Sequence, residues 1–299
     1  MISRLTTAAL LASLLGACAS RNIDLEKLSS PSDEIVWQAG QKAVEDKDWS
    51  SARQYFRRII DAFPQSQHQP EARIALADTY MQAGGVGNYI LAVSSYREFL
   101  TLYPSHRLSP YAQFQAAEAY YKQMNSPDRD QTATRQALEE YQRLLDIYPD
   151  SDQVEKARER VQDCRQTLAR SEFMVGYFYQ RTRKAYRASV ARYEGILRSY
   201  PDYDQLDEVL YRLGETLATV ARYAEARPPL ARLIEEFPKS QFVDEATKLL
   251  ARMPPVLPAS PQSPAAEEAP QVAPAGPPAD PTPVPAPPEG PVLEQPPQV

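Results

Sequence analysis

Apolar residues in the middle of the chain recur with the period of an α-helix, and each periodic stretch ends at an aromatic–proline pair. The pair occurs five times, at Phe63-Pro64, Tyr103-Pro104, Tyr148-Pro149, Tyr200-Pro201 and Phe237-Pro238. Eight residues before each proline stands a large apolar or aromatic residue: Phe56, Tyr96, Tyr141, Tyr193 and Leu230. Twelve residues before it stands a small one: Ala52, Ala92, Ala137, Ser189 and Ala226. These spacings lay one apolar stripe along a helix, and the proline and the residue before it end that helix.

A second helical stretch precedes each of these helices and carries a small residue where a partner helix must come close. In the second to fifth units the small residues are Ala77, Ala117, Gly176 and Gly214. Paired helices of this kind resemble the tetratricopeptide repeat. The pattern therefore predicts an all-α solenoid of five helical hairpins, closed by a capping helix from Ser240 to Met253, because a terminal repeat has no neighbour to cover its outer face.

The prolines are spaced further apart than the roughly 34 residues of an ideal repeat. We expect the surplus in wide turns at 84–87 and 125–131, and in one long helix from Asp152 to Gln180, a stretch without proline. This organisation predicts repeats 1–3 in residues 33–150. Residues 151–253 then hold the long connecting helix, repeats 4 and 5 and the cap.

The two ends of the chain differ in composition from the repeats. Residues 254–299 contain 17 prolines and read as a disordered, proline-rich tail, because they cannot bury enough apolar surface to offset the cost of ordering. Residues 1–17 read as a signal peptide with an apolar run that ends in Leu15-Gly16-Ala17. Cys18 follows directly, which resembles the lipobox of bacterial lipoproteins and predicts lipidation of Cys18, with residues 18–32 as the lipidated linker. An ordinary signal peptide cut after Ala17 is the alternative.

The lipobox, linker and repeats together resemble the BamD family, lipoprotein subunits of the β-barrel assembly machinery of Gram-negative outer membranes. The resemblance is strongest in 46–52 and 129–202, which includes Glu172 to Tyr179 and Arg192 to Pro201. It implies a lipid-anchored protein (palmitate among its acyl chains) on the periplasmic face of the outer membrane. The implied partners are the POTRA region of BamA, other subunits of the machinery and unfolded outer-membrane proteins.

Two groups of residues are candidates for binding. Tyr80, Phe114, Tyr120 and Tyr121 could line a peptide groove in repeats 2 and 3, although packing in the core is the alternative for each. A basic stretch from Arg181 to Arg198 contains one acid, Glu194, and invites an acidic partner. Within it Arg187 and Arg192 are the candidate BamA docking residues, and a solvated helix face is the alternative.

Several function classes are disfavoured by the sequence. With His68 and His106 as the only histidines, and no G-x-S-x-G, H-E-x-x-H or P-loop pattern, we expect no catalytic residues, no metal site and no cofactor. A net charge of −6 argues against nucleic-acid binding. The alternative function is a periplasmic tetratricopeptide-repeat coordinator of cell-wall synthesis and envelope constriction.

Overall fold

The structure is a computed structural model that describes residues 32–255, so the predicted signal peptide, Cys18 and the proline-rich tail lie outside the described residues. Within that range the chain is all-α, with no β-strand. The α-helices are α1 (Asp33–Glu45), α2 (Trp49–Ala62), α3 (Gln69–Ala83), α4 (Val86–Leu102), α5 (Ser109–Tyr121), α6 (Thr132–Ile147), α7 (Val154–Phe178), α8 (Tyr186–Ser199), α9 (Leu206–Thr219), α10 (Tyr223–Glu236) and α11 (Val243–Arg252). A π-helical turn, η2 (Tyr179–Arg183), continues α7.

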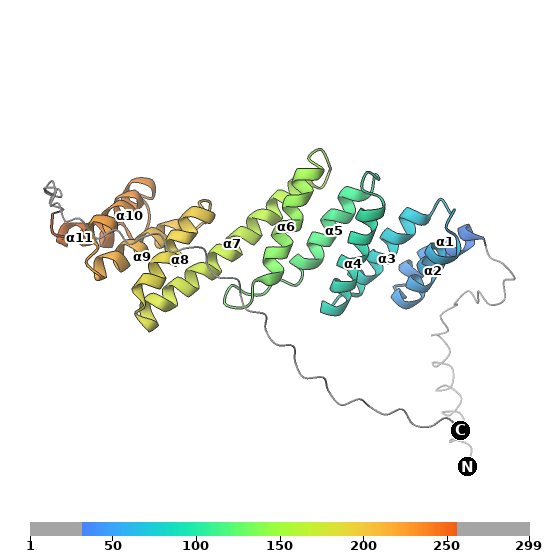
Figure 1. Cartoon of the computed structure of the whole chain (residues 1–299), viewed down its shortest axis with the longest axis horizontal. Helices are drawn as coiled ribbons and strands as arrows, with labels where there is room; N and C mark the ends of the chain where they lie inside the picture. The colour runs from blue at the N-terminus through green and yellow to red at the C-terminus, as the bar shows by residue number, and fades with distance from the viewer. Residues whose placement is uncertain (1–31, 256–299) are drawn as a thin grey trace, which may run out of the picture. The chain divides into compact units, whose positions relative to one another are not determined.

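Consecutive helices pack against one another along the chain, which confirms the predicted solenoid (Figure 1). Five hairpins pair α1 with α2, α3 with α4, α5 with α6, α7 with α8, and α9 with α10. The single helix α11 packs on α10 and α9, as the predicted cap should. Residues 32–255 lie in one compact unit, and the division after residue 150 stays a prediction.

The aromatic–proline pairs end the second helix of each hairpin. Phe63, Tyr103, Tyr148, Tyr200 and Phe237 each leave the helical conformation, and their N–H groups still donate to the carbonyl four residues back. The five residues eight positions before the prolines are buried, as are the five small residues twelve before. The repeat pattern is therefore a packing pattern, with the small residue facing the neighbouring helix.

In repeats 1, 4 and 5 the paired helices approach each other more closely than alanine would allow, and a Cβ added to Gly40 in the first repeat would lie 2.6 Å from Cε1 of Phe56. A Cβ added to Gly214 would lie 2.4 Å from Cγ of Leu230, and one added to Gly176 would lie 2.8 Å from Cε1 of Tyr193. Neither distance is sterically possible without a shift of the packed side chain. In repeats 2 and 3 the same places hold Ala77 and Ala117, both fully buried.

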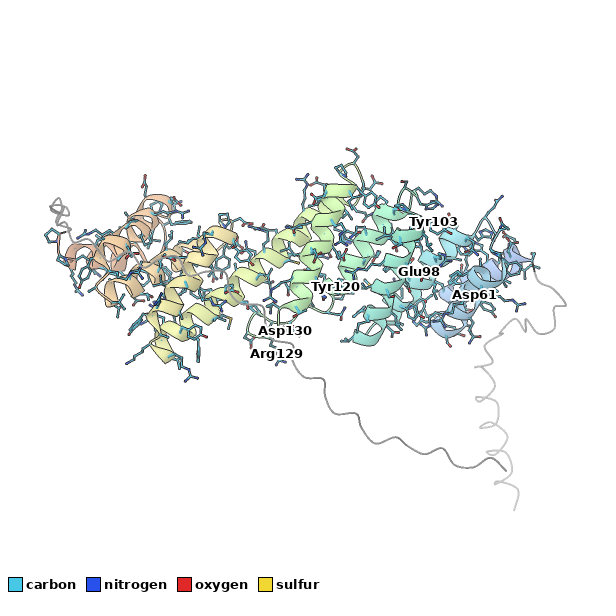
Figure 2. The ribbon with its side chains drawn as sticks, in the orientation of Figure 1. Asp61, Glu98, Tyr103, Tyr120, Arg129 and Asp130 are labelled. Carbon is cyan, nitrogen blue, oxygen red and sulfur yellow. The ribbon has the colours of Figure 1, made fainter. Side chains whose placement is uncertain are left out.

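Of the two wide turns that the sequence predicts, the structure contains one and not the other. The turn from Asn125 to Gln131 is present between α5 and α6, and Arg129 and Asp130 lie in it (Figure 2). The prediction of a wide turn at 84–87 is wrong, because α4 already begins at Val86 and only Gly84 and Gly85 connect it to α3. Both glycines have positive φ, 69° and 85°, so a sharp two-residue turn is possible there. The residues in excess of an ideal repeat lengthen α4 instead, which has 17 residues.

Candidate protein-docking surfaces

The four aromatic residues expected to line a peptide groove are mostly core residues. Phe114 is 1% exposed and Tyr80 is 6% exposed, so neither ring presents a binding surface. Phe114 packs against Tyr141 with 5.6 Å between ring centroids. The Tyr80 hydroxyl accepts a hydrogen bond from Arg57, and the Arg53 guanidinium lies 5.1 Å from its ring.

Tyr120 and Tyr121 are half-buried at the end of α5, and cations cover both rings. The Arg97 guanidinium lies 5.6 Å from the Tyr120 ring centroid, and that of Arg160 lies 4.3 Å from Tyr121. Tyr120 is placed between the helices of the N-terminal repeats in Figure 2. Of the four candidates, these two alone keep accessible ring surface.

A half-buried carboxylate, Asp78, holds two tyrosines of these repeats in place. Asp78 accepts hydrogen bonds from the hydroxyls of Tyr96 and Tyr111, the second at 3.0 Å. Burial raises the pKa of Asp78 above its ordinary value, and the two hydrogen bonds offset only part of that shift. The same burial, with the nearby carboxylate, raises the pKa of both tyrosines. The Asp78 cluster is therefore a structural network that joins α3, α4 and α5.

A second network joins α5, α6 and α7. Glu118 accepts from the Tyr141 hydroxyl at 2.6 Å and from Nε of Arg160 at 2.9 Å. The Tyr121 hydroxyl donates to Asp163 at 2.9 Å. These bonds fix the orientation of α7 against the third hairpin. Beyond this point α7 continues into the C-terminal repeats.

The candidate docking arginines lie on α8 and are both exposed. Arg192 donates to Oε2 of Glu172 on α7 at 2.6 Å, while Arg187 has no carboxylate partner in the part of the chain that the structure describes. A cavity of about 450 Å³ opens beside this ion pair, and its lining residues also include Gly195, Ser199 and Tyr200. The α8 surface, defined as Arg187, Arg192, Gly195 and this cavity, is thus basic and hollowed.

No contact among the described residues explains why a glycine stands at position 195, in the middle of α8. A Cβ placed there would meet no atom within 4 Å, although glycine in a helix interior costs about 1 kcal/mol relative to alanine. Close approach by another molecule would account for it.

The end of α7 carries exposed aromatic residues that the sequence reasoning placed simply in a helix. Tyr177 is 39% exposed and Phe178 is 45% exposed, and Met174 one turn earlier is 37% exposed. A sequence signal was available, because the three successive aromatics Tyr177, Phe178 and Tyr179 fan out over about 200° of a helix and cannot all face one core.

The remaining chemistry of the described residues is sparse. Cys164 is fully buried, its Sγ lies 3.8 Å from Sδ of Met124, and burial raises its pKa to about 12. No helix within 32–255 is long and apolar enough to cross a membrane. Over the same range no three His, Cys, Asp or Glu side chains gather as a metal-binding group.

Comparison with known proteins identifies the family. Residues 30–227 match the family described as "YfiO: Outer membrane lipoprotein". A protein of Caulobacter vibrioides named outer membrane protein assembly factor BamD is 27% identical over 217 residues, which cover 73% of this chain and 70% of that relative. Proteins of the same name from Rickettsia prowazekii and Haemophilus influenzae are 24% and 25% identical, covering 83% and 68% of this chain and 97% and 79% of theirs.

Solved structures of repeat proteins are also similar, among them a thermophilic tetratricopeptide-repeat protein of Thermus thermophilus. It is 19% identical, with 74% of this chain and 100% of that chain covered and a TM-score of 0.31. The family match spans most of the chain and all but the last of its helical hairpins in full. The chain therefore belongs to the YfiO family of outer-membrane lipoproteins, as its resemblance to BamD predicts.

Proposed function

We propose that this protein is an outer-membrane protein assembly factor, a scaffold that docks on the POTRA region of BamA and receives unfolded outer-membrane proteins. The observation that carries the proposal is the 27% identity over 217 residues with a relative that bears this name. The family match over residues 30–227 takes in α1 to α9, and through them the surfaces on which a solenoid binds its partners. The names of the relatives favour this function over the envelope-constriction coordinator.

Docking on BamA is assigned to the α8 surface. Arg187 and Arg192 give it positive charge, the cavity beside Arg192 has room for side chains of a partner, and Gly195 permits close approach of a backbone. An acidic segment of the POTRA region is the matching partner.

Unfolded substrates are assigned to the N-terminal repeats. A cavity of about 230 Å³ between α2, α3 and α4 combines the apolar Ile60 and Leu76 with Arg57, Arg73 and Glu98, which suits an extended peptide. Asp61 also lines this cavity, and both Asp61 and Glu98 are labelled in Figure 2. Tyr120 and Tyr121 remain candidate contacts, while Tyr80 and Phe114 support the fold beneath them.

The protein acts without catalysis, metal or cofactor in this proposal, since scaffolding needs only binding surfaces. Lipid on Cys18 holds the protein at the outer membrane. Two or more acyl chains make such anchoring stable, because one chain binds only marginally. Cys18→Ala should leave the protein out of outer-membrane fractions, and a variant that still matured and fractionated normally would contradict the anchor.

The test of the docking surface is Arg192→Glu, measured as capture of purified BamA. Losing a desolvated charged contact costs about 2 kcal/mol or more, which is roughly a 30-fold loss of affinity. Arg187→Glu should weaken capture further, and Arg198→Glu on the same helix is the matched charge control.

A second variant separates docking from local folding. Glu172→Arg with Arg192→Glu restores the ion pair between α7 and α8 with its sign exchanged, so the fold is kept while the surface charge at position 192 is reversed. We expect capture of BamA to stay low in this double variant. Recovery of capture would show that the ion pair only supports the helices. Intact assembly of outer-membrane barrels after depletion of the protein would favour the coordinator instead.

A further inference from the structure

The last turns of α7 expose apolar side chains that the proposed function does not use. Met174 and Val175 are 37% and 36% exposed, and Tyr177 and Phe178 are 39% and 45% exposed. At about 3.6 residues per turn these four positions cover roughly 160° of the helix circumference. Phe173 lies on the opposite side of the helix and is buried in the core. The outer side of this helix end is therefore apolar and accessible.

Basic side chains follow directly in the π-helical turn η2. The turn ends at Lys184, which has a left-handed backbone with φ 53°, and the N–H of Ala185 donates to the Tyr179 carbonyl at 2.9 Å. The chain reverses here into α8, so that Arg183 and Lys184 stand at the end of the hairpin, and both are exposed. We define the α7 tip as Met174, Val175, Tyr177, Phe178, Arg183 and Lys184.

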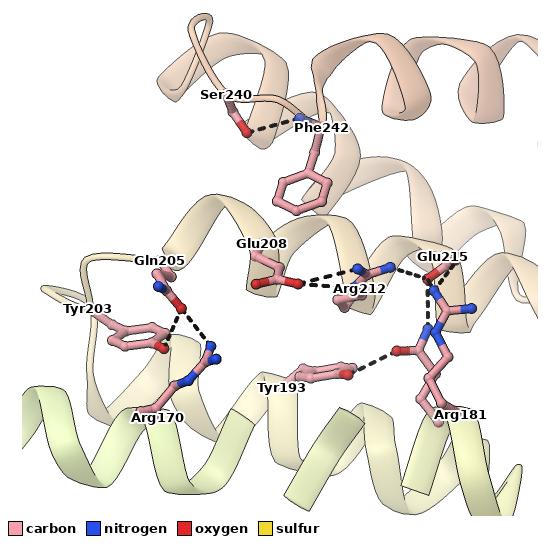
Figure 3. A network of polar contacts seen from close by, with 11 residues as sticks. Arg170, Arg181, Tyr193, Tyr203, Gln205, Glu208, Arg212, Glu215, Ser240 and Phe242 are labelled. Carbon is pink, nitrogen blue, oxygen red and sulfur yellow. Dashed lines mark hydrogen bonds and ion pairs between the residues drawn. The ribbon is translucent and has the colours of Figure 1, made fainter. Parts of the chain in front are cut away.

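The two cations of the α7 tip have no carboxylate partner in the described repeats. Arg181 on the same turn binds Glu215 of α9 at 3.0 Å, which holds η2 against the fifth hairpin (Figure 3). The Arg183 guanidinium instead lies 5.6 Å from the ring centroid of Phe178, and Lys184 makes no ion pair within 32–255. The tip is thus fixed in place by one arginine and leaves its other charges available to a partner.

The sequence around the tip is basic although the chain as a whole is acidic. Residues 173–193 contain five bases and no acid, in a chain with a net charge of −6. Two of these bases, Arg187 and Arg192, belong to the α8 surface, whereas Arg183 and Lys184 precede it in η2 and its cap. An excess of one charge on a protruding end favours a partner of the opposite charge.

A second hairpin tip at the same edge of the array is apolar and uncharged. Residues 79–96 contain no charged side chain, and at the start of α4 Val86 is 64% exposed, Ile90 59% and Leu91 47%. Because consecutive helices run in opposite directions, the α3–α4 turn and the α7–α8 turn lie at one edge, the lower edge in Figure 1. Two separate hairpins therefore present apolar groups at one edge of the repeats.

A bilayer surface matches this edge better than a protein surface does. Aromatic rings beside Arg and Lys are the composition that proteins place at membrane–water interfaces. The cations attract anionic headgroups, and an aliphatic helix end without charge enters the headgroup region without desolvating an ion. Both tips are ends of hairpins, which a flat partner can reach. The family is one of outer-membrane lipoproteins, so a bilayer is close by.

We propose that the α7 tip lies on the surface of a bilayer that carries anionic phospholipids, with the start of α4 as a second contact. A lipid on Cys18 holds the chain at the membrane without fixing how the repeats face it. Contact through two hairpin tips turns one edge of the repeats toward the bilayer. The α8 surface then stays available to BamA.

Vesicle binding by the unlipidated protein tests the proposal. The mature chain from Ala19 carries an environment-sensitive fluorophore on Thr182→Cys, an exposed position in η2, and is mixed with vesicles of phosphatidylethanolamine and phosphatidylglycerol. We expect a severalfold rise in emission, with quenching by nitroxide-labelled lipid. Thr101→Cys in the last turn of α4 is the matched control, because it is exposed at the opposite edge and should show no rise. Cys164 is buried and does not compete for the label.

Two variants separate the contributions of charge and ring. Each cation near an anionic bilayer strengthens binding about fivefold, so Arg183→Gln with Lys184→Asn should weaken vesicle binding roughly 25-fold. Asparagine is chosen at position 184 because it tolerates the left-handed conformation. Phe178→Ala should weaken binding severalfold. Both variants should capture BamA in detergent as the unchanged chain does, so this proposal and docking through the α8 surface can fail separately.

Three results would overturn the proposal. Equal signals from positions 182 and 101, or vesicle binding that the tip variants leave unchanged, would show that the tip does not meet the bilayer. Equal binding to vesicles of phosphatidylcholine alone would contradict the match to anionic lipid. Loss of BamA capture in the tip variants, without a vesicle-dependent signal at position 182, would make the tip a protein interface.

Discussion

The tyrosine eight residues before the proline is buried in repeats 2, 3 and 4, yet its hydroxyl has a different partner at the two ends of the molecule. In the N-terminal repeats Tyr96 donates to Asp78 and Tyr141 to Glu118, both carboxylates. In the C-terminal repeats Tyr193 donates to the neutral amide of Gln180, at 2.9 Å. The carboxylate in this network, Glu215, accepts a hydrogen bond from Gln180 and not from the tyrosine. It also binds Arg181 and Arg212.

Arginines cover aromatic rings in both halves of the array, but the exposure of those rings differs. The buried acid Glu118 draws Arg160 inward, and that arginine covers Tyr121. In the C-terminal repeats Arg212 lies over the Tyr177 ring and Arg183 over the Phe178 ring, yet these side chains stay 39% and 45% exposed. The number of aromatics in a repeat therefore says less about binding than the exposure of each ring.

The largest expected effect comes from truncating one phenylalanine at each end. Phe114→Ala should lower the free energy of unfolding by about 3–5 kcal/mol, because it empties a buried site. Phe178→Ala should change it by less than about 0.5 kcal/mol, since that ring is exposed. Urea unfolding followed by circular dichroism measures both, and equal losses would abolish the contrast between core and surface.

The second contrast concerns the acceptors of the buried hydroxyls. Glu118→Ala should cost about 3 kcal/mol, because Tyr141 and Arg160 both lose a partner in a poorly solvated place. Gln180→Ala should cost about 1–2 kcal/mol, the range for a neutral buried hydrogen bond. A larger loss for Gln180→Ala in the same unfolding experiment would mean that the charged network is not the stronger one.

A third pair of variants tests the close helix packing at Gly214 in the fifth repeat. Gly214→Ala should destabilise by about 1–3 kcal/mol through overpacking against Leu230. Gly195→Ala is the control, and it should stabilise the isolated protein by up to about 1 kcal/mol, because the added methyl meets open space in a helix. If Gly195→Ala also weakens capture of BamA while raising the melting temperature, the missing side chain serves the partner.

The smallest effects depend on pH, and they have opposite signs at the two ends. The pKa of Asp78 is raised by burial, so the folded protein binds this proton more tightly and loses stability as pH rises above the ordinary value of 3.8. Asp78→Asn should therefore gain stability relative to wild type between pH 4 and pH 8. Hydrogen bonds from Arg165 lower the pKa of Asp202, so stability is lost as pH falls and Asp202→Asn should show the reverse trend. Unfolding at several pH values measures both differences, and trends of the same sign would contradict the assigned causes.

The architecture was predictable because local rules determine it. Proline and the apolar stripe identify each helix end, and the long helix expected from Asp152 to Gln180 is present as α7, Val154–Phe178, followed by η2. The π-helical turn was missed because it lies at the very end of α7, where no further turn follows to show the shifted apolar period. The cap is likewise three residues shorter at its start than expected, beginning at Val243.

The docking surfaces were less predictable, because periodicity places a residue on a helix face and does not say what covers that face. Phe114 and Phe178 both stand in apolar stretches, and only tertiary packing buries one and exposes the other. Arg187 and Arg192 could be predicted as exposed from charge alone. The cavity beside Arg192 depends on the open space at Gly195, which no spacing rule reveals.

The unbroken helix α7 also has a consequence for how the array comes apart. Its first half packs Val154, Ala157 and Cys164 into the core of the third hairpin, and its second half packs Ala169 and Phe173 into the core of the fourth and fifth. In most solenoids a loop lies at such a boundary, and a front of unfolding can pause there at little cost. Within α7 a pause would create two new helix ends with unpaired N–H and C=O groups. Cooperativity should therefore pass straight through this boundary, so that repeats three and four melt as one block.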